Sequence, residues 1–308
     1  MKNKVLFLPA FVTLLFSFCH AQEYQSLEID LKDSKIYVRD FGNDNGTPLL
    51  LINGGPGFSS EGFVGLAKEL SSHYRVILYD QRGTGKSGLS KIDTSTIKMD
   101  LMVADIEAIR NYIGIDNWIV MGHSFGGMLA YYYAVKHPDR IRAMIQSSSG
   151  GPDLDLFNTP ASLGIQGKLT DAEQDSLNYW SQKISQGDTT FHANLKRAEF
   201  LAPAYLYNKK NVATVAARLT QGDMTINGLV WTDMRSIGFD CKEKLKTFTK
   251  PVLIIHGKED ILHTQIPKNA HELLPNSKLV LLEHCAHYGW LDRPDAYFSE
   301  IYAFTDAL

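Results

Sequence analysis

The sequence contains few cysteines and no excess of charge of either sign. Cysteine occupies three of 308 positions. The chain has 31 Lys and Arg residues and 34 Asp and Glu residues, for a formal net charge of −3. So few cysteines exclude a disulfide framework. Without a basic excess or a cluster of Lys and Arg, nucleic acid is not expected as a partner. Beyond residue 21 no apolar run reaches the roughly 20 residues of a membrane span. With neither repeats nor low-complexity segments, the mature chain should be soluble and globular.

The first 21 residues have the layout of a secretory signal peptide. Two lysines precede the apolar run 5–18, and Ala21 provides a small residue for cleavage. The run, about 14 residues, is short for a membrane span. We therefore predict export, to the periplasm or the medium, after cleavage near Ala21. Two alternatives stay open, an uncleaved N-terminal anchor and a lipid on Cys19, although the bulky Phe18 disfavours the lipid.

Cleavage would leave two cysteines, Cys241 and Cys285. We expect Cys285 to be a small packed thiol. A Cys241–Cys285 disulfide is the alternative, since exported proteins can form such bonds.

Two patterns of apolar residues predict the fold class. Residues 26–32 and 35–41 alternate apolar and polar side chains, as in an antiparallel hairpin with one solvated face. Six later runs are short and almost wholly apolar, which is typical of strands buried on both faces of a parallel sheet. They are residues 49–52, 76–79, 118–121, 141–145, 252–255 and 279–282.

Helical patterns lie between these runs, at 63–70, 97–113, 126–136 and 266–274. Such alternation predicts an α/β fold with right-handed crossovers and a doubly wound, mostly parallel sheet.

The alternation is interrupted by a polar and aromatic stretch that is too long for a loop. It contains helical patterns at 171–184 and 211–219. We predict a helical cap inserted at 150–236, with the α/β core formed by 22–149 and 237–308.

A glycine-rich turn provides a candidate nucleophile. Gly122 and Gly126 flank Ser124, in a G-x-S-x-G pattern between the apolar run 118–121 and a helical pattern. A sharp strand-to-helix turn lifts such a serine above the sheet edge, and glycines let the neighbouring backbone pass closely. The helix that follows directs its positive end at the site.

Serine needs a base, and in this arrangement an acid and then a histidine follow it along the chain. Asp260 follows the run 252–255, and His287 follows the run 279–282. Their neighbours Glu259 and His284 compete for these roles. His287 alone begins an H-x-x-x-x-D-x-P register that ends at Pro294, so we predict a Ser124–His287–Asp260 triad.

Acyl transfer also needs hydrogen-bond donors for the oxyanion. The backbone N–H of Phe125, directly after the nucleophile, is one candidate. Gly55, in the glycine-rich stretch after the run 49–52, is the other.

Two further motifs resemble a phosphate-binding loop and a metal site, but each lacks a required residue. Gly85-Lys86-Ser87 imitates the end of a phosphate-binding loop, but that motif requires glycine where Asp80 stands. His284-Cys285-x-His287 lacks the second ligand pair of a metal site. No metal and no cofactor is expected.

The chain resembles the proline iminopeptidase family of α/β-hydrolases. Three segments carry the resemblance, Gly54-Gly-Pro-Gly57, Asp80-Gln-Arg-Gly-x-Gly-x-Ser87 and Gly122-x-Ser-x-Gly-Gly127. The resemblance implies an α/β-hydrolase fold, an acyl-enzyme on the serine, and acidic groups near the cap that hold the free α-amine of the substrate.

The sequence departs from the family pattern in its acidic groups. Ile261 stands where a carboxylate would follow the triad acid, and Asn53 replaces the histidine before Gly-Gly-Pro-Gly. The segment around Asp223 is similar to an acidic cap segment, which nominates Asp223 to bind the amine; a solvated turn residue is the alternative.

These observations predict a serine hydrolase that acts on small peptides or other small molecules. An aminopeptidase releasing N-terminal proline or other residues is the first expectation. An esterase, lactonase or amidase for small neutral substrates is the alternative, which Ile261 favours. A binding protein without hydrolytic activity would leave the serine, histidine and aspartate unexplained.

Overall fold

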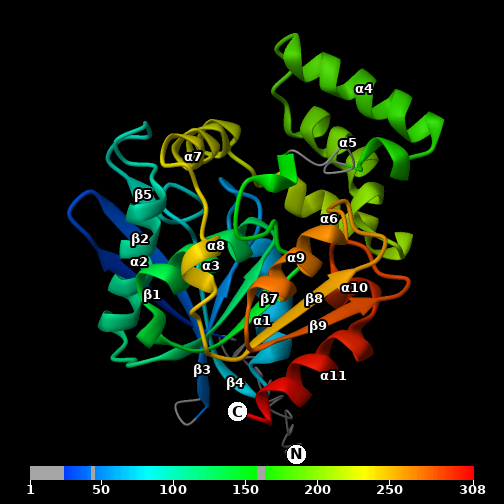
Figure 1. The fold of residues 1–308 in the computed structure, drawn as a ribbon. Coiled ribbons are helices and arrows are strands. Elements are labelled where there is room, and N and C mark those ends of the chain that lie inside the picture. Colours follow the sequence, from blue (N-terminus) through cyan, green and yellow to red (C-terminus); the bar gives the residue numbers. More distant parts are fainter. Residues whose placement is uncertain (1–23, 43–45, 158–163) are drawn as a thin grey trace, which may run out of the picture.

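The structure is a computed structural model that describes residues 24–42, 46–157 and 164–308, without the side chains of Phe157 and Gln166. The expected signal peptide, residues 1–21, lies outside the described residues. A nine-stranded sheet crosses the molecule, with helices packed against it and further helices above one of its edges (Figure 1).

The sheet is parallel except at its N-terminal side. Its order is β1-β2-β4-β3-β6-β7-β8-β9, and the short β5 pairs with β2. Strand β2 runs antiparallel to both β1 and β4, and every later pairing along the path is parallel. The strands are β1 Gln25–Asp30, β2 Ser34–Phe41, β3 Thr47–Ile52, β4 Tyr74–Tyr79, β5 Gly88–Leu89, β6 Trp118–His123, β7 Ile141–Ser147, β8 Val252–Gly257 and β9 Ser277–Leu282.

Each face of the sheet buries its own apolar core, because successive strand residues point to opposite faces. In β3, Leu50 and Ile52 belong to one core, and Leu49 and Leu51 to the other. The first core is completed by α2 (Met99–Tyr112), α3 (Phe125–Lys136) and α9 (Gln265–Leu273). The second is completed by α1 (Val64–Leu70) and α11 (Pro294–Thr305). Burial on both faces explains the uninterrupted apolar runs, and the predicted α/β-hydrolase fold is confirmed.

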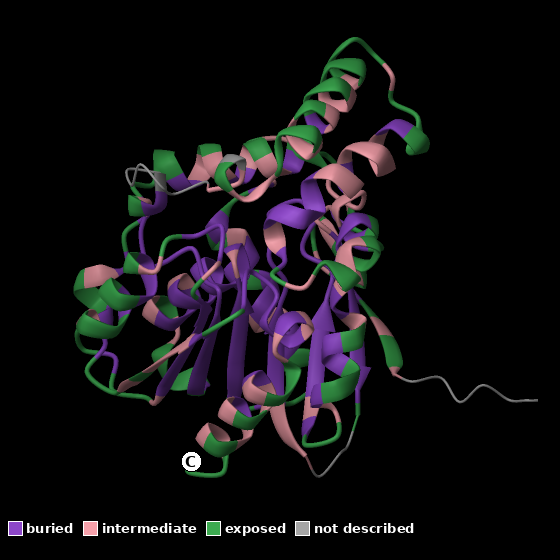
Figure 2. Cartoon of the chain, turned by 90° about the vertical axis from the view of Figure 1, so that its right-hand side faces the viewer, coloured by how far each residue is buried: buried purple, intermediate pink, exposed green. Residues whose placement is uncertain are grey.

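Of the described α-helices between β7 and β8, the first four lie above the edge of the sheet (Figure 1). They are α4 Asp171–Ser185, α5 Phe191–Leu201, α6 Val212–Leu219 and α7 Met224–Ser236. Helix α4 begins with a capping box between Thr170 and Glu173 and buries only Leu177 along its length. Buried residues concentrate in the strands, whereas these upper helices are largely exposed (Figure 2).

The chain returns to the core through α8 (Lys242–Leu245), and α10 (Gly289–Asp292) follows β9. Cys241 and Cys285 are both buried free thiols, so the alternative of a disulfide between them is wrong. Among the helices of the described ranges, none combines the length and apolar character required to cross a bilayer.

Gly257, at the end of β8, provides a test of the close packing beneath the site. A Cβ at this position would lie 2.2 Å from the carbonyl oxygen of Cys285 and 2.3 Å from that of Ala286. We expect Gly257→Ala to lower the free energy of unfolding by about 2 kcal/mol or more, since backbone must shift to admit the methyl group.

The matched control is Gly65→Ala in α1, where no atom lies within 4 Å of the added Cβ. There alanine should raise stability by roughly 0.5–1 kcal/mol, because it restricts the unfolded chain and favours helix. Urea unfolding measures both variants. Equal effects would contradict the account.

Candidate active site

Ser124 occupies a sharp turn between β6 and α3, in a backbone conformation that is rare for a residue with a side chain. Its φ is 55° and its ψ is −120°. A Cβ at Gly126 would lie 2.2 Å from the carbonyl oxygen of Ile52, and one at Gly122 would lie 2.3 Å from that of Gly126. Only glycine fits at these two positions. The strain, on the order of 1–3 kcal/mol, holds the serine at the N-terminus of α3.

Asp260 and His287 are joined by a hydrogen bond. The two residues follow β8 and β9, whose carboxyl ends meet at one edge of the sheet. Nδ1 of His287 lies 2.8 Å from Oδ1 of Asp260, and the backbone N–H of Leu262 donates to the same oxygen at 3.0 Å. When Nδ1–H donates to the carboxylate, Nε2 carries the lone pair that a general base needs.

The surroundings of Asp260 keep its carboxylate ionised. Burial raises its pKa, but the neighbouring imidazoles of His287 and His256 and the hydrogen bonds outweigh this and bring the pKa to about 2. His256 donates from Nε2 to the carbonyl of Leu262 at 2.9 Å, and its Nε2 lies 3.7 Å from Oδ2 of Asp260.

Two buried histidines beside the site stay neutral. Burial lowers the pKa of His256 and lowers that of His123 well below its usual value. The ring of His123 lies 4.6 Å from that of His287. Their positions at the ends of β6 and β8 were the only feature of the sequence that set these two apart from the other histidines.

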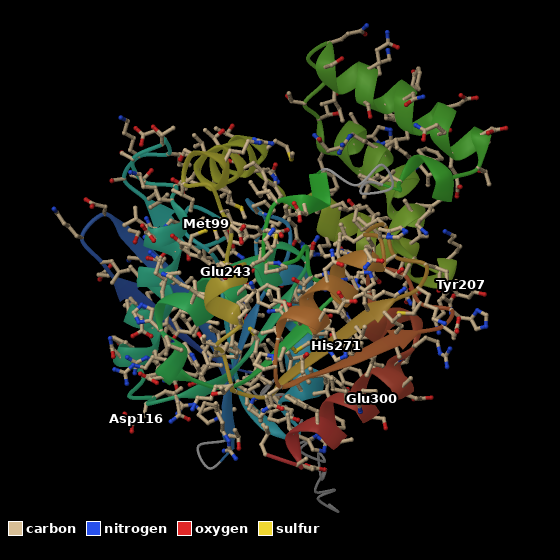
Figure 3. The ribbon with its side chains drawn as sticks, viewed as in Figure 1. Met99, Asp116, Tyr207, Glu243, His271 and Glu300 are labelled. Carbon is tan, nitrogen blue, oxygen red and sulfur yellow. The ribbon has the colours of Figure 1, made fainter. Side chains whose placement is uncertain are left out.

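The competing residues have other partners. Glu259 accepts a hydrogen bond from the backbone of Cys285 at 3.0 Å. His284 is exposed, and its ring lies 5.0 Å from that of Tyr207, at the edge of the molecule (Figure 3). The structure thus brings Asp260 rather than Glu259 to His287. No group of three or more potential metal ligands occurs within the described ranges.

Asp292 is the aspartate of the H-x-x-x-x-D-x-P pattern that begins at His287, and its contacts explain why an aspartate stands there. Its carboxylate is buried and accepts hydrogen bonds from the backbone N–H groups of Ala286 at 2.9 Å, Tyr207 at 3.0 Å and Asn208 at 2.8 Å. It therefore ties the loop that carries His287 to the chain that follows α5.

Gly55 and Phe125 both line the cavity that Ser124 faces. Gly55 has a φ of 67°, which glycine adopts readily. Phe125 is the first residue of α3, so its N–H has no acceptor within the helix. Neither N–H donates a hydrogen bond to any residue of the described chain. Both are thus available to an oxyanion.

Asp80 holds the far end of the glycine-rich loop. Its carboxylate accepts from the backbone N–H of Ser60 at 2.8 Å, from the Ser60 hydroxyl at 2.7 Å and from the N–H of Lys86 at 2.9 Å. Gln81 donates to the carbonyl of Asn53 at 2.9 Å. The segment that imitates a phosphate-binding loop is therefore a support for residues 53–60.

The upper helices hold the same loop from the other side. The N–H of Asp223 donates to the carbonyl of Gly57 at 2.8 Å, and Asn227 donates to that of Pro56 at 2.9 Å. Arg218 of α6 donates to the carbonyl of Gly54 at 2.8 Å. The loop is thus fixed by contacts from both the core and the inserted helices.

Asp223 does not reach the cavity. Its side chain is exposed and caps α7, where Oδ1 accepts from the N–H groups of Thr225 at 2.8 Å and Ile226 at 3.1 Å. A carboxylate engaged in this way is stabilised by the helix N-terminus, and Asp223 is not among the residues that line the cavity. This placement corresponds to the alternative, a solvated turn residue, and does not support an amine-binding role for Asp223.

The cavity beside Ser124 has a volume of about 480 Å³. Phe58, Met128, Trp231 and Ile261 contribute apolar walls, and His287 and Tyr205 lie at its base. Burial raises the pKa of Tyr205 to about 12, so its hydroxyl stays protonated.

Arg197 and Arg218 also line this cavity, whereas none of its described lining residues is Asp or Glu. A neighbouring hollow of about 680 Å³ shares Arg218 and holds Glu61, Glu69 and Asp295, but Ser124 does not line it. The carboxylates of this second hollow therefore lie outside the cavity of the nucleophile.

Sequence reasoning missed both arginines. For Arg218 a signal existed, since it lies three residues after the apolar Val215 and shares its buried helix face. For Arg197 the sequence offered none.

The comparisons with known proteins agree with this geometry. The model of the alpha/beta hydrolase fold family matches residues 47–294. The chain belongs to this family.

Two curated relatives are named proline iminopeptidase. The one from Heyndrickxia coagulans is 28% identical over 91% of this chain and 98% of its own length, and that from Saccharolobus solfataricus is 27% identical over 88% of each. An alpha/beta fold family hydrolase from Bacillus anthracis superposes with a TM-score of 0.75 at 20% identity, over 91% of this chain and 99% of its own. The predicted resemblance to proline iminopeptidases is confirmed, as is the prediction of a serine hydrolase of this superfamily.

Asp292→Ala tests how the histidine loop is held. It would leave three backbone N–H groups without their acceptor, each at a cost of about 1–3 kcal/mol if it stays buried. We expect the free energy of unfolding to fall by about 3 kcal/mol and hydrolysis to fall with it, measured by urea unfolding and by ester hydrolysis. Asp295→Ala, at an exposed position three residues on, should change neither. Equal losses in the two variants would contradict a specific role for Asp292.

Proposed function

We propose that this chain is a serine hydrolase that cleaves small peptides, amides or esters through an acyl-enzyme on Ser124. The observation that carries the proposal is the Asp260–His287 hydrogen bond of 2.8 Å, made at the cavity that Ser124 enters from its strained turn.

The residues support the following sequence of steps. His287 Nε2 takes the proton of the Ser124 hydroxyl as its oxygen attacks the substrate carbonyl. The N–H groups of Gly55 and Phe125 stabilise the oxyanion. The tetrahedral intermediate collapses, and the imidazolium gives its proton to the leaving amine or alcohol. Water, deprotonated by His287, then attacks the ester and releases the acid and the serine.

Two candidate substrate classes follow. Aminopeptidase activity on N-terminal proline or other residues is supported by the curated relatives. They are named proline iminopeptidase, and the match covers 98% and 88% of their own length. An esterase or amidase that needs no free amine is supported by the cavity, since Ile261 is apolar and Asp223 lies outside. Rates on prolyl-naphthylamide, its N-blocked form and short-chain esters separate the two classes.

His287→Ala should reduce kcat by roughly 10⁴-fold or more, as loss of a triad base does. His284→Ala, three residues away and exposed, is the matched control and should keep most activity. The wild-type rate should fall as the pH is lowered from 8 to 5, because a protonated base cannot accept the serine proton. The pKa of Asp260, about 2, lies too low to account for that fall.

The measurement is kcat/KM for a p-nitrophenyl ester between pH 5 and pH 8. A flat profile, or similar losses in both histidine variants, would argue against His287 as the base.

A further inference from the structure

The two arginines of the cavity differ in their partners. Arg218 is buried, donates to the carbonyl of Gly54, and lies over the rings of Phe58 and Phe63 at 5.1 Å each. Arg197 of α5 is half-buried and makes no hydrogen bond or ion pair with any residue of the described chain. Arg218 is thus fixed by the protein, while the guanidinium of Arg197 is available to a ligand.

Tyr205 lines the same cavity as the two arginines and His287. Its ring contacts that of His287, with centroids 5.5 Å apart. Burial raises the pKa of its hydroxyl, and the positive charges of Arg218 and Arg197 act against that rise. That hydroxyl makes no hydrogen bond to the described residues, so it is a further donor facing the cavity.

The charge of the cavity disfavours one ligand and favours another. A substrate ammonium group would leave water for a cavity whose described lining carries two guanidinium groups and no carboxylate, which is costly. A carboxylate would meet a planar, permanently charged guanidinium that can bind it with two parallel hydrogen bonds.

We infer that the cavity selects substrates that carry a carboxylate near the scissile carbonyl, bound by Arg197 together with the hydroxyl of Tyr205. This inference rests on the proposed function and adds to it the chemical class of the substrate. The carboxylate has two sources. It is part of the acyl group, as in a half-ester of a dicarboxylic acid, or of the leaving group, as in the C-terminus of a dipeptide.

Two substrate pairs distinguish these sources. The first is mono-p-nitrophenyl glutarate against p-nitrophenyl pentanoate, which differ in a terminal carboxylate on the acyl chain. The second is the dipeptide Pro-Gly against its C-terminal amide. We expect the wild-type enzyme to prefer the anionic member of one pair by about tenfold in kcat/KM, equivalent to about 1.4 kcal/mol.

Arg197→Gln should reduce that preference to less than about threefold, and Arg197→Lys should retain part of it. Lys196→Gln is the matched control, because Lys196 lies on the same helix, pairs with Glu199 at 2.7 Å and does not line the cavity. It should leave the preference intact. Protection of Ser124 from labelling gives a readout that does not depend on turnover. Glutarate should slow the reaction of Ser124 with a fluorophosphonate at a lower concentration than pentanamide needs for the same effect.

A preference in the ester pair assigns the carboxylate to the acyl group, and one in the peptide pair assigns it to the leaving group. The inference is overturned if neither preference nor protection is seen, or if Arg197→Gln leaves them unchanged. Ser124→Ala separates this failure from failure of the proposed function, since ester hydrolysis that survives Ser124→Ala would overturn the function itself.

Discussion

The backbone at Ser124 is the constraint on which the active site depends. Ser124 is held at φ 55° where Gly122 of β6 packs against the carbonyl of Gly126, and Gly126 packs against that of Ile52, with no room for a side chain at either glycine. The same turn sets the direction of α3, places the Phe125 N–H at the helix start and aims the serine into the cavity. Packing of the core thus supplies the strain that the site requires.

The remaining groups reach the serine because parallel strands end at one edge. Asp260 and His287 follow neighbouring strands, and Asp292 and Asp80 then fix the loops by accepting backbone hydrogen bonds. These two buried carboxylates replace water as acceptors for loop N–H groups, which orders the loops at this edge of the sheet.

The sequence predicted the elements whose burial is simple and missed those that depend on tertiary contacts. Strands buried on both faces leave unbroken apolar runs, so each was recognisable. The order of Ser124, Asp260 and His287 after strands predicted a triad, whose role in hydrolysis stays a prediction. Helices α5 and α7 were not predicted from the sequence. Asp223 directly precedes α7, a position in which capping is the ordinary role of aspartate. The charge of the cavity could not be predicted, since Arg197 and Arg218 face Ser124 only after two separate helices fold over the sheet.

The central claim, that Ser124 is a nucleophile activated by its surroundings, is tested most directly by covalent labelling. The folded protein is treated with a fluorophosphonate, and its intact mass and peptide map are measured. The account predicts a single adduct, located on Ser124, which does not form in heat-denatured protein, where the turn at Ser124 and the Asp260–His287 pair are lost. An adduct on a different residue, or no adduct on the folded protein, would contradict it.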